Sequence, residues 1–233
     1  MRRVVLVLAV LSVAVRADAT HRTPPCSGCT LDVAASASTD PVPLVVVLHG
    51  DTDNAHERAD KWRDAVLARG WALLSLDCPE ELGCRDGSWY RWDRDASWVR
   101  EQVSEVVEQI AIDTSRIYII GWSGGATFIG QHLQEWPSMF AAAVIHGGGV
   151  PPRAQGCPDR PFAMYFLVGD RNPAHASAKR LRRFAQACDQ DVRWDLVPGA
   201  NHAKEDAALT PDKADQILAW LATKRHDDVL VAR

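Results

Sequence analysis

The chain has 233 residues, of which 47% are hydrophobic and 24% are charged, and its formal net charge at pH 7 is −4. This length suits one domain with a sizeable buried core and is too short for two comfortable domains. The acidic balance disfavours nucleic acid and anionic lipid as partners, because both carry negative charge.

The first 19 residues have the pattern of a secretory signal peptide. Arg2 and Arg3 precede an almost wholly apolar run at 4–15, and residues 17–19 read Ala-Asp-Ala, an A-x-A cleavage site. The run is shorter than the roughly 20 residues that span a bilayer, so cleavage before Thr20 is favoured over a membrane anchor. Cleavage removes three Arg and one Asp, which changes the net charge to −6. We expect a secreted or periplasmic protein without membrane insertion after cleavage.

Six cysteines follow the expected cleavage site, and an even number in an exported protein favours disulfides. Sequence cannot choose among the connectivities, but the short-range pairs Cys26–Cys29, Cys78–Cys84 and Cys157–Cys188 are our prediction. The first pair could instead be half of a zinc site or a redox motif. No second Cys-x-x-Cys or close His pair completes a zinc site. The motif also follows two prolines rather than a strand, so a structural disulfide is favoured.

Apolar runs alternate with helical periodicities along the chain. The run 44–48 (Leu-Val-Val-Val-Leu) is typical of a central parallel strand that is buried on both faces. Further strands are predicted at 71–76, 117–120, 141–145, 162–168 and 192–197, with 31–35 as a candidate edge strand. Helices are predicted at 55–69, 96–111, 124–135, 174–187 and 211–223. This alternation predicts an α/β fold with a doubly wound, mostly parallel sheet and helices on both faces. A single domain would span 20–224, and 225–233 would be a C-terminal tail.

The most informative stretch is residues 121–125, which read Gly-Trp-Ser-Gly-Gly. An apolar strand precedes it and a helix-compatible segment follows, so Ser123 lies at the apex of a strand–turn–helix. Such a turn lifts the serine Oγ clear of the sheet and directs the next backbone N–H at a developing oxyanion. Ser123 is therefore the candidate nucleophile.

Chemically competent residues follow several of the predicted strands. His49, Ser123, His146, Asp170 and His202 each come at or just after a strand end. Ligands bind beyond the carboxyl ends of the strands in a doubly wound sheet. Ser123, Asp170 and His202 have the chain order of one known type of catalytic triad. His202 would be the general base, and Asp170 would hold its other ring nitrogen.

Three assignments keep alternatives. The acid often lies three residues after the glycine that ends its strand, and that position is Asn172, so Asp170 is only the nearest carboxylate. Asp195, inside the next predicted strand, is a weaker candidate for the acid. An amide in place of the acid would stabilise the wrong histidine tautomer. His49 could pack beneath the loop that follows it, and His146 could line the site.

The remaining site predictions concern the oxyanion hole and the substrate pocket. The backbone N–H groups of Gly124 and Asp51 are the expected oxyanion donors. Trp89, Trp92 and Trp122 are aromatic candidates for the pocket wall, together with His49 and His146. The tryptophans of the 88–98 segment could equally pack a loop held by the Cys78–Cys84 disulfide.

From about residue 29 to 224, the chain resembles secreted esterases of the α/β-hydrolase superfamily. It is most similar to the polyhydroxybutyrate-depolymerase-like and feruloyl-esterase-like group. The matching motifs are Leu-His-Gly at 48–50, Gly-Trp-Ser-Gly-Gly-Ala at 121–126, Gly-Asp at 169–170 and Gly-Ala-Asn-His at 199–202. The loop at 51–54 and Asn172 depart from the group's pattern.

The resemblance implies an α/β-hydrolase fold and hydrolysis of a small-molecule or polymeric carboxylic ester through an acyl-serine, with no metal or organic cofactor. A thioesterase or peptidase on the same scaffold is an alternative. A binding protein of this fold that has lost turnover is another, because of Asn172.

Overall fold

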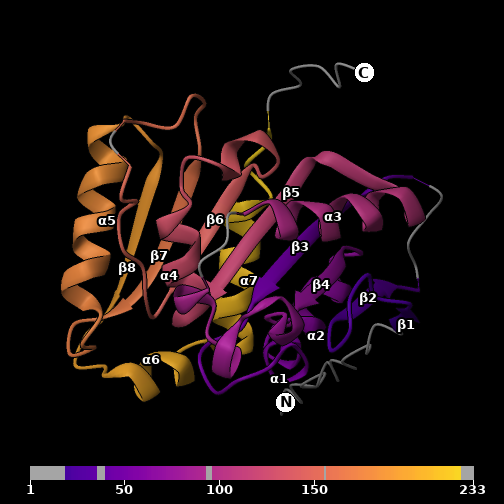
Figure 1. Cartoon of the computed structure of the whole chain (residues 1–233), viewed down its shortest axis with the longest axis horizontal. Coiled ribbons are helices and arrows are strands. Elements are labelled where there is room, and N and C mark those ends of the chain that lie inside the picture. The colour runs from indigo at the N-terminus through magenta and orange to yellow at the C-terminus, as the bar shows by residue number, and fades with distance from the viewer. Residues whose placement is uncertain (1–18, 36–39, 93–95, 155, 227–233) are drawn as a thin grey trace, which may run out of the picture.

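In a computed structural model, residues 19–35, 40–92, 96–154 and 156–226 are described. The predicted signal peptide, apart from Ala19, and most of the predicted tail lie outside these ranges. The described chain forms one eight-stranded sheet with the order β1-β2-β4-β3-β5-β6-β7-β8 (Figure 1). The strands are β1 (Ala19–Arg22), β2 (Thr30–Ala34), β3 (Val42–Leu48), β4 (Ala72–Leu76), β5 (Ile112–Trp122), β6 (Ala142–His146), β7 (Ala163–Gly169) and β8 (Val192–Val197).

Pairing within the sheet is mixed. β1 and β2 pair antiparallel, and β2 joins β4 antiparallel, whereas β4, β3, β5, β6, β7 and β8 are parallel to one another. The parallel arrangement brings the carboxyl ends of β3, β5, β6, β7 and β8 to one edge of the sheet. That edge is where ligands bind in doubly wound sheets.

Helices cover both faces of the sheet, as predicted. They are α1 (Ala55–Asp60), α2 (Arg63–Ala68), α3 (Ser97–Gln109), α4 (Gly124–Gln131), α5 (His175–Ala187), α6 (His202–Ala207) and α7 (Pro211–Leu221). The described residues also form four 3₁₀ turns: η1 (Glu80–Leu82), η2 (Arg85–Gly87), η3 (Trp89–Arg91) and η4 (Trp136–Ser138). Apolar residues of α3, α4 and α5 pack on one face, and those of α1, α2 and α7 pack on the other. Figure 1 shows α7 behind the strands.

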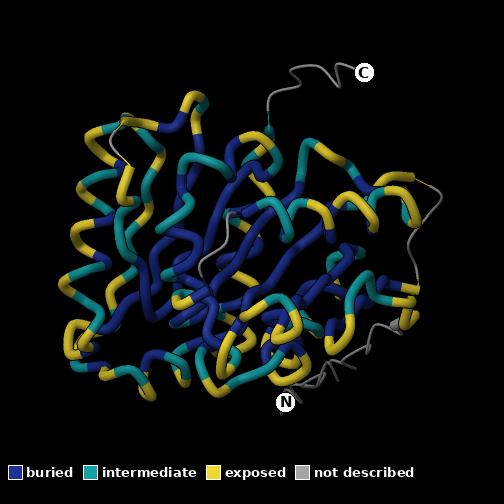
Figure 2. Tube along the Cα trace, viewed as in Figure 1, coloured by how far each residue is buried: buried dark blue, intermediate teal, exposed yellow. Residues whose placement is uncertain are grey.

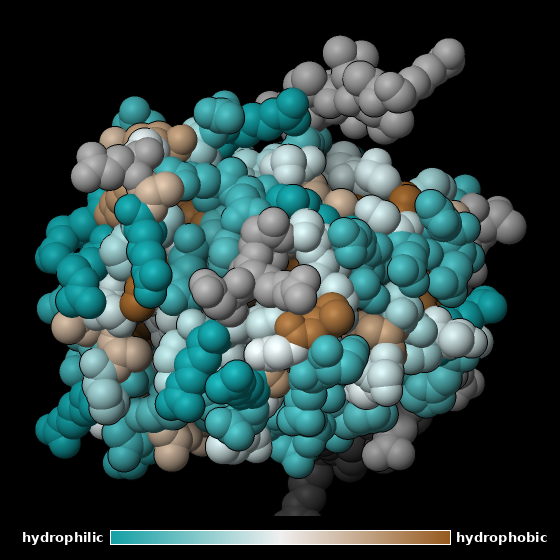
Figure 3. All heavy atoms as spheres, in the orientation of Figure 1, coloured by the Kyte–Doolittle hydropathy of each residue, from teal (hydrophilic) through white to brown (hydrophobic). Residues whose placement is uncertain are grey.

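The strand β3 shows why the sheet is the centre of the core. Leu44, Val46 and Leu48 join the cluster on one face, while Val45 and Val47 join the cluster on the other. Successive side chains of a strand point to opposite faces, so an unbroken apolar run requires cover on both sides. The central strands are accordingly buried along their length (Figure 2), while the face seen in Figure 3 is mostly hydrophilic with small, separate hydrophobic patches.

Several elements differ from the sequence-based prediction, including β1, where no strand was predicted, and α4, which is four residues shorter than predicted. The predicted helix at 55–69 is two helices, α1 and α2, which meet at the buried Trp62. β5 begins five residues before the predicted strand start and pairs through Ile112 with Val42. α6 was not predicted; Asn201 caps it by accepting a hydrogen bond from the Lys204 N–H, as N-cap asparagines do.

The three predicted disulfides are confirmed: the bonds join Cys26 to Cys29, Cys78 to Cys84, and Cys157 to Cys188. Among the described helices, none combines the length and the apolar character that a membrane crossing requires.

Candidate active site

Ser123 lies at a sharp turn between β5 and α4, with φ 50° and ψ −104°. A non-glycine residue with positive φ is strained, and two hydrogen bonds hold this turn in place. The Ser123 N–H donates to the His146 carbonyl (2.8 Å), and the Gly125 N–H donates to the His49 carbonyl (3.1 Å). The turn is therefore fixed to the ends of both neighbouring strands.

The glycines at 121 and 125 are required by close backbone approach. A Cβ on Gly121 would meet the backbone of Ala126, and a Cβ on Gly125 would lie 2.6 Å from the Leu48 carbonyl oxygen. Because real Cβ atoms do not approach backbone so closely, only glycine lets α4 start this near to the sheet.

His202, the first residue of α6, faces the same cavity as Ser123. This cavity has a volume of about 370 Å³. The His202 ring stacks on Trp122, with ring centroids 4.5 Å apart and 13° between the planes. Among the hydrogen bonds of the described residues, none joins the Ser123 Oγ to His202. Catalytic hydrogen bonds are often long without substrate, so the shared cavity still brings the predicted nucleophile and base together.

A buried arginine also contacts the ring of Trp122. The Arg58 guanidinium lies 5.0 Å from the Trp122 ring centroid and is neutralised by two carboxylates. Its Nε donates to the Asp53 Oδ2 (2.8 Å), and its Nη1 donates to the Asp206 Oδ1 (2.8 Å). Burial and the positive charge of Arg58 lower the pKa of His202, against the opposing effect of Asp206. The histidine is therefore favoured in its neutral form, which a general base needs.

The two predicted oxyanion donors, Gly124 and Asp51, belong to segments that pack against each other near Ser123. Gly124 is the first residue of α4, so its N–H has no intrahelical acceptor. A Cβ on Gly124 would lie 3.5 Å from the Asp51 backbone nitrogen, so the backbone of Asp51 passes close to the start of α4. The Asp51 side chain is held by the Ser88 hydroxyl, which donates to its Oδ1 (2.9 Å).

The predicted acid, Asp170, does not reach the histidine. Its Oδ1 accepts a hydrogen bond from the Gly199 N–H (2.7 Å), and the residue is exposed. Asn172 lies there instead, with its Nδ2 3.0 Å from the His202 Nδ1. The Asp170 side chain turns outward at the end of β7, whereas the chain brings residue 172 back beneath His202. The other candidate, Asp195, is bound to Tyr165 and Lys213.

A carboxylate that the sequence analysis missed lies behind Asn172. The Glu205 Oε2 accepts a hydrogen bond from the Asn172 Nδ2 at 2.6 Å, and the Glu205 side chain is fully buried. Burial raises the pKa of Glu205, against the opposing hydrogen bonds from Asn172 and backbone N–H groups. Glu205 follows His202 by three residues, and positions three apart share one face of a helix. This three-residue spacing is the sequence feature that could have identified Glu205 as a neighbour of His202.

The other predicted pocket residues have mixed positions. Trp122 lines the cavity, as predicted. Trp89 and Trp92 do not; both are buried against Phe128 and pack the core, which corrects their assignment to the pocket wall. Their loop is held by the Cys78–Cys84 disulfide, so the packing alternative applies.

The two further histidines are buried below the cavity. The His49 Nδ1 lies 2.7 Å from the Gly50 carbonyl, and its Nε2 accepts from the Cys78 N–H (3.1 Å). The His146 Nε2 lies 3.1 Å from the Glu205 carbonyl, and burial lowers its pKa to about 3. His146 therefore stays neutral and supports Trp122, 4.3 Å away. Neither histidine lines the cavity.

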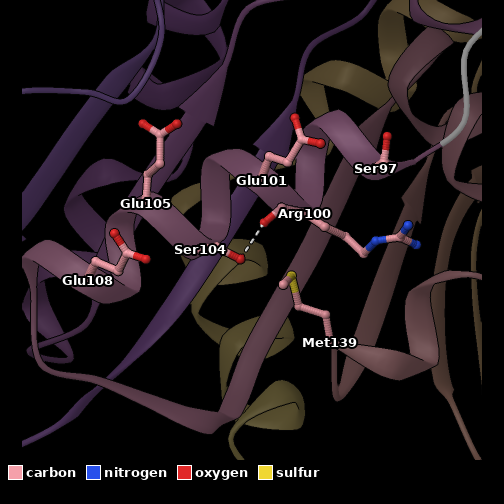
Figure 4. Close-up of a pocket in the computed structure, with 7 residues that line it drawn as sticks. All are labelled: Ser97, Arg100, Glu101, Ser104, Glu105, Glu108 and Met139. Carbon is pink, nitrogen blue, oxygen red and sulfur yellow. Dashed lines mark hydrogen bonds between the residues drawn. The ribbon is translucent and has the colours of Figure 1, made fainter. Parts of the chain in front are cut away.

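A larger hollow of about 530 Å³ lies elsewhere, along α3 (Figure 4). Glu101, Glu105 and Glu108 extend from this helix, and the Ser104 hydroxyl donates to the Arg100 carbonyl. No histidine or strained serine lines this hollow. Within the described ranges, no group of three or more His, Cys, Asp or Glu side chains is arranged to hold a metal ion.

Comparison with known proteins identifies the family of the chain. The profile of a family described as esterase PHB depolymerase matches residues 28–158, more than half of the chain. A comparison with curated protein sequences gives no significant match.

Solved structures share the fold at low identity. A thermostable esterase is 20% identical with a TM-score of 0.66, over 90% of this chain but only 63% of its own. The Bacillus cereus carboxylesterase is 17% identical with a TM-score of 0.64, over 84% of this chain and 94% of its own. An S-formylglutathione hydrolase from Agrobacterium tumefaciens is 14% identical with a TM-score of 0.66, over 88% of this chain and 93% of its own. The predicted α/β-hydrolase fold is thereby confirmed.

Proposed function

The chain belongs to the esterase PHB depolymerase family, and we propose that it is a serine hydrolase of carboxylic esters. Ser123 is the nucleophile and His202 is the general base. The substrate is a small-molecule or polymeric ester, and the protein acts outside the cytoplasm after signal-peptide cleavage. Three disulfides support this location, because such bonds persist in oxidising compartments.

The observation that carries the proposal is the strained turn at Ser123 in a cavity that it shares with His202. Strain of this kind persists only where surrounding structure enforces it, and it concentrates at functional sites. The N–H groups of Gly124 and Asp51 supply what acyl transfer needs, namely donors for the negative oxygen of the tetrahedral intermediate.

The reaction follows from these positions. The Ser123 Oγ attacks the ester carbonyl carbon, and the His202 Nε2 accepts the hydroxyl proton as the new C–O bond forms. Collapse of the intermediate breaks the bond to the alcohol, which takes its proton from His202. Water then attacks the acyl-serine with the same base and releases the acid. A thioesterase or peptidase would use the same steps with a different leaving group.

A second candidate function is ester binding without efficient turnover. It is favoured by the contact between Asn172 and His202, because an amide does not stabilise the imidazolium as a carboxylate does. Both candidates use the same cavity and differ only in the rate of acyl transfer.

The test is hydrolysis of 4-nitrophenyl acetate and butyrate by the purified protein and by Ser123→Ala. Ser104→Ala is the matched control, since its hydroxyl lies exposed on α3. We expect turnover above background and fluorophosphonate labelling at Ser123, both lost in Ser123→Ala and kept in the control. Labelling without turnover would favour the binding protein. Absence of both labelling and turnover would refute the proposal.

A further inference from the structure

The Asn172 side chain lies between a buried carboxylate and the ring of His202. Its Nδ2 is 2.6 Å from the Glu205 Oε2 and 3.0 Å from the His202 Nδ1. Asn172 and Glu205 are both buried. The pair therefore occupies the place behind the histidine that a single acid fills in a Ser-His-Asp triad.

Fixed backbone groups determine which way the amide faces. The Asn172 Oδ1 accepts from the Ala174 N–H (2.9 Å), and its Nδ2 donates toward the Gly147 carbonyl (3.3 Å). An N–H can only donate and a carbonyl can only accept. If the amide were rotated by 180°, its NH₂ group would face the Ala174 N–H and its carbonyl oxygen would face the Gly147 carbonyl. The Oδ1 would also lie against the Glu205 carboxylate. The nitrogen therefore faces His202.

This orientation determines the tautomer of the histidine. The two N–H groups of the Asn172 amide have three acceptors within reach: the Glu205 carboxylate, the Gly147 carbonyl and the His202 Nδ1. An amide nitrogen does not accept hydrogen bonds, so a proton on the His202 Nδ1 would face it without an acceptor. In a neutral imidazole the single proton then lies on the Nε2. A base that takes the Ser123 proton needs a bare Nε2. The analogous aspartate-to-asparagine change in a serine protease lowers kcat about ten-thousandfold through the wrong tautomer.

We propose that Asn172, oriented by Glu205, is a positioning residue that keeps the His202 proton on the Nε2 and so restrains the attack of Ser123. The inference rests on the proposed function, with Ser123 and His202 as the reacting pair. Glu205 contributes by accepting from the amide nitrogen, which holds that nitrogen toward the ring. Exchanging the acid and the amide between positions 172 and 205 releases the restraint.

The double variant Asn172→Asp/Glu205→Gln is the direct test. A carboxylate at position 172 accepts from the Ala174 N–H and from a protonated His202 Nδ1, while the new amide at 205 donates to it. The formal charge of the pair is unchanged. We expect kcat for 4-nitrophenyl butyrate to rise at least about tenfold, with about ten-thousandfold as the ceiling. Asn172→Asp alone places two carboxylates within hydrogen-bonding distance, and they must share a proton, so its gain is smaller.

Asn201→Asp is the matched control. It adds a carboxylate next to His202 in sequence and keeps an oxygen that can cap α6, but it does not replace the amide at the His202 Nδ1. If a carboxylate placed near His202 were enough to raise kcat, Asn201→Asp would raise it as well. A gain in Asn201→Asp equal to that of the double variant would overturn the proposal.

A spectroscopic measurement reads the tautomer without relying on turnover. In nitrogen-15 NMR of the histidine-labelled protein, with the His202 signals assigned by comparison with His202→Gln, we expect a bare Nδ1 and a protonated Nε2. The double variant should reverse this pattern. If the neutral His202 ring of the unaltered protein carries its proton on the Nδ1, the proposal is overturned. This result does not depend on whether the double variant folds. Loss of the proposed function appears separately, as turnover that survives Ser123→Ala.

Discussion

Replacing Arg58 by methionine should destabilise the protein, because it leaves the Asp53 carboxylate without its charged partner. The Arg58 side chain is 6% exposed and that of Asp53 is 11% exposed. Breaking a buried ion pair by removing one partner costs about 3–5 kcal/mol. Asp206 is more exposed and keeps Lys61 at 3.0 Å, so we expect the lower end, about 3 kcal/mol. For a chain of this size the melting temperature should fall by about 6–12 °C.

Acidification distinguishes this mechanism from a loss of packing. Burial raises the pKa of Asp53, but the charge and hydrogen bonds of Arg58 outweigh it, so the net pKa lies below its ordinary value of 3.8. The pKa of Asp206 is lowered in the same way. Carboxylates with depressed pKa values stabilise the fold above their unfolded pKa, and that stability is lost as pH falls through the folded value. The cost of Arg58→Met should therefore shrink below about pH 4.

The assay is urea unfolding of the unaltered protein and of Arg58→Met at about pH 7 and about pH 3. Lys61→Met is the matched control. It removes a 40%-exposed partner of Asp206 and should cost about 0–1 kcal/mol. A cost for Arg58→Met below about 1 kcal/mol at neutral pH, or one that stays constant on acidification, would refute the ion-pair argument.

Two further predictions concern the disulfides and the charge of the cavity. Replacing Cys157 and Cys188 by serine removes a disulfide whose cysteines are 31 residues apart. The free energy of unfolding in urea should fall by about 3–4 kcal/mol, compared with about 1.5 kcal/mol when Cys26 and Cys29 are replaced. Equal losses for the two pairs would contradict the loop-entropy estimate. Four acidic and two basic residues line the cavity, and both basic residues are already paired with carboxylates. A 4-nitrophenyl ester with a carboxylate on its acyl chain should therefore show about fivefold lower kcat/KM than a neutral ester of equal length, with a gap that narrows as salt rises. An equal or higher value at low salt would contradict the prediction.

The central fold was predictable because its signals are local. Apolar runs such as that of β3 identify strands that are buried on both faces, and the glycines around Ser123 identify the turn. The order of Ser123 and His202 along the chain, each after a strand, predicted that they would meet at one edge of the sheet. Short separations along the chain also favoured the disulfide pairs that the structure contains.

The acid could not be predicted, because its identity depends on how three residues after β7 turn. Asp170 and Asn172 are two positions apart: the usual spacing of the acid favoured position 172, whereas the only carboxylate of the two is at position 170. The structure directs Asp170 to the Gly199 N–H and Asn172 to the ring. Likewise, tryptophan near a strand end is compatible with a pocket wall or with the core, and only packing against Phe128 assigns Trp89 to the core.

The turn at Ser123 links the chemistry to the order in which the chain assembles. Its conformation depends on carbonyls at the ends of β6 and of the segment after β3, which lie more than 20 and more than 70 residues away in the sequence. A peptide or nascent chain that contains only Gly-Trp-Ser-Gly-Gly lacks these partners, and loop-closure entropy makes such distant contacts form late. Until the central strands have assembled, Ser123 would therefore lack the strained turn on which its proposed reactivity depends.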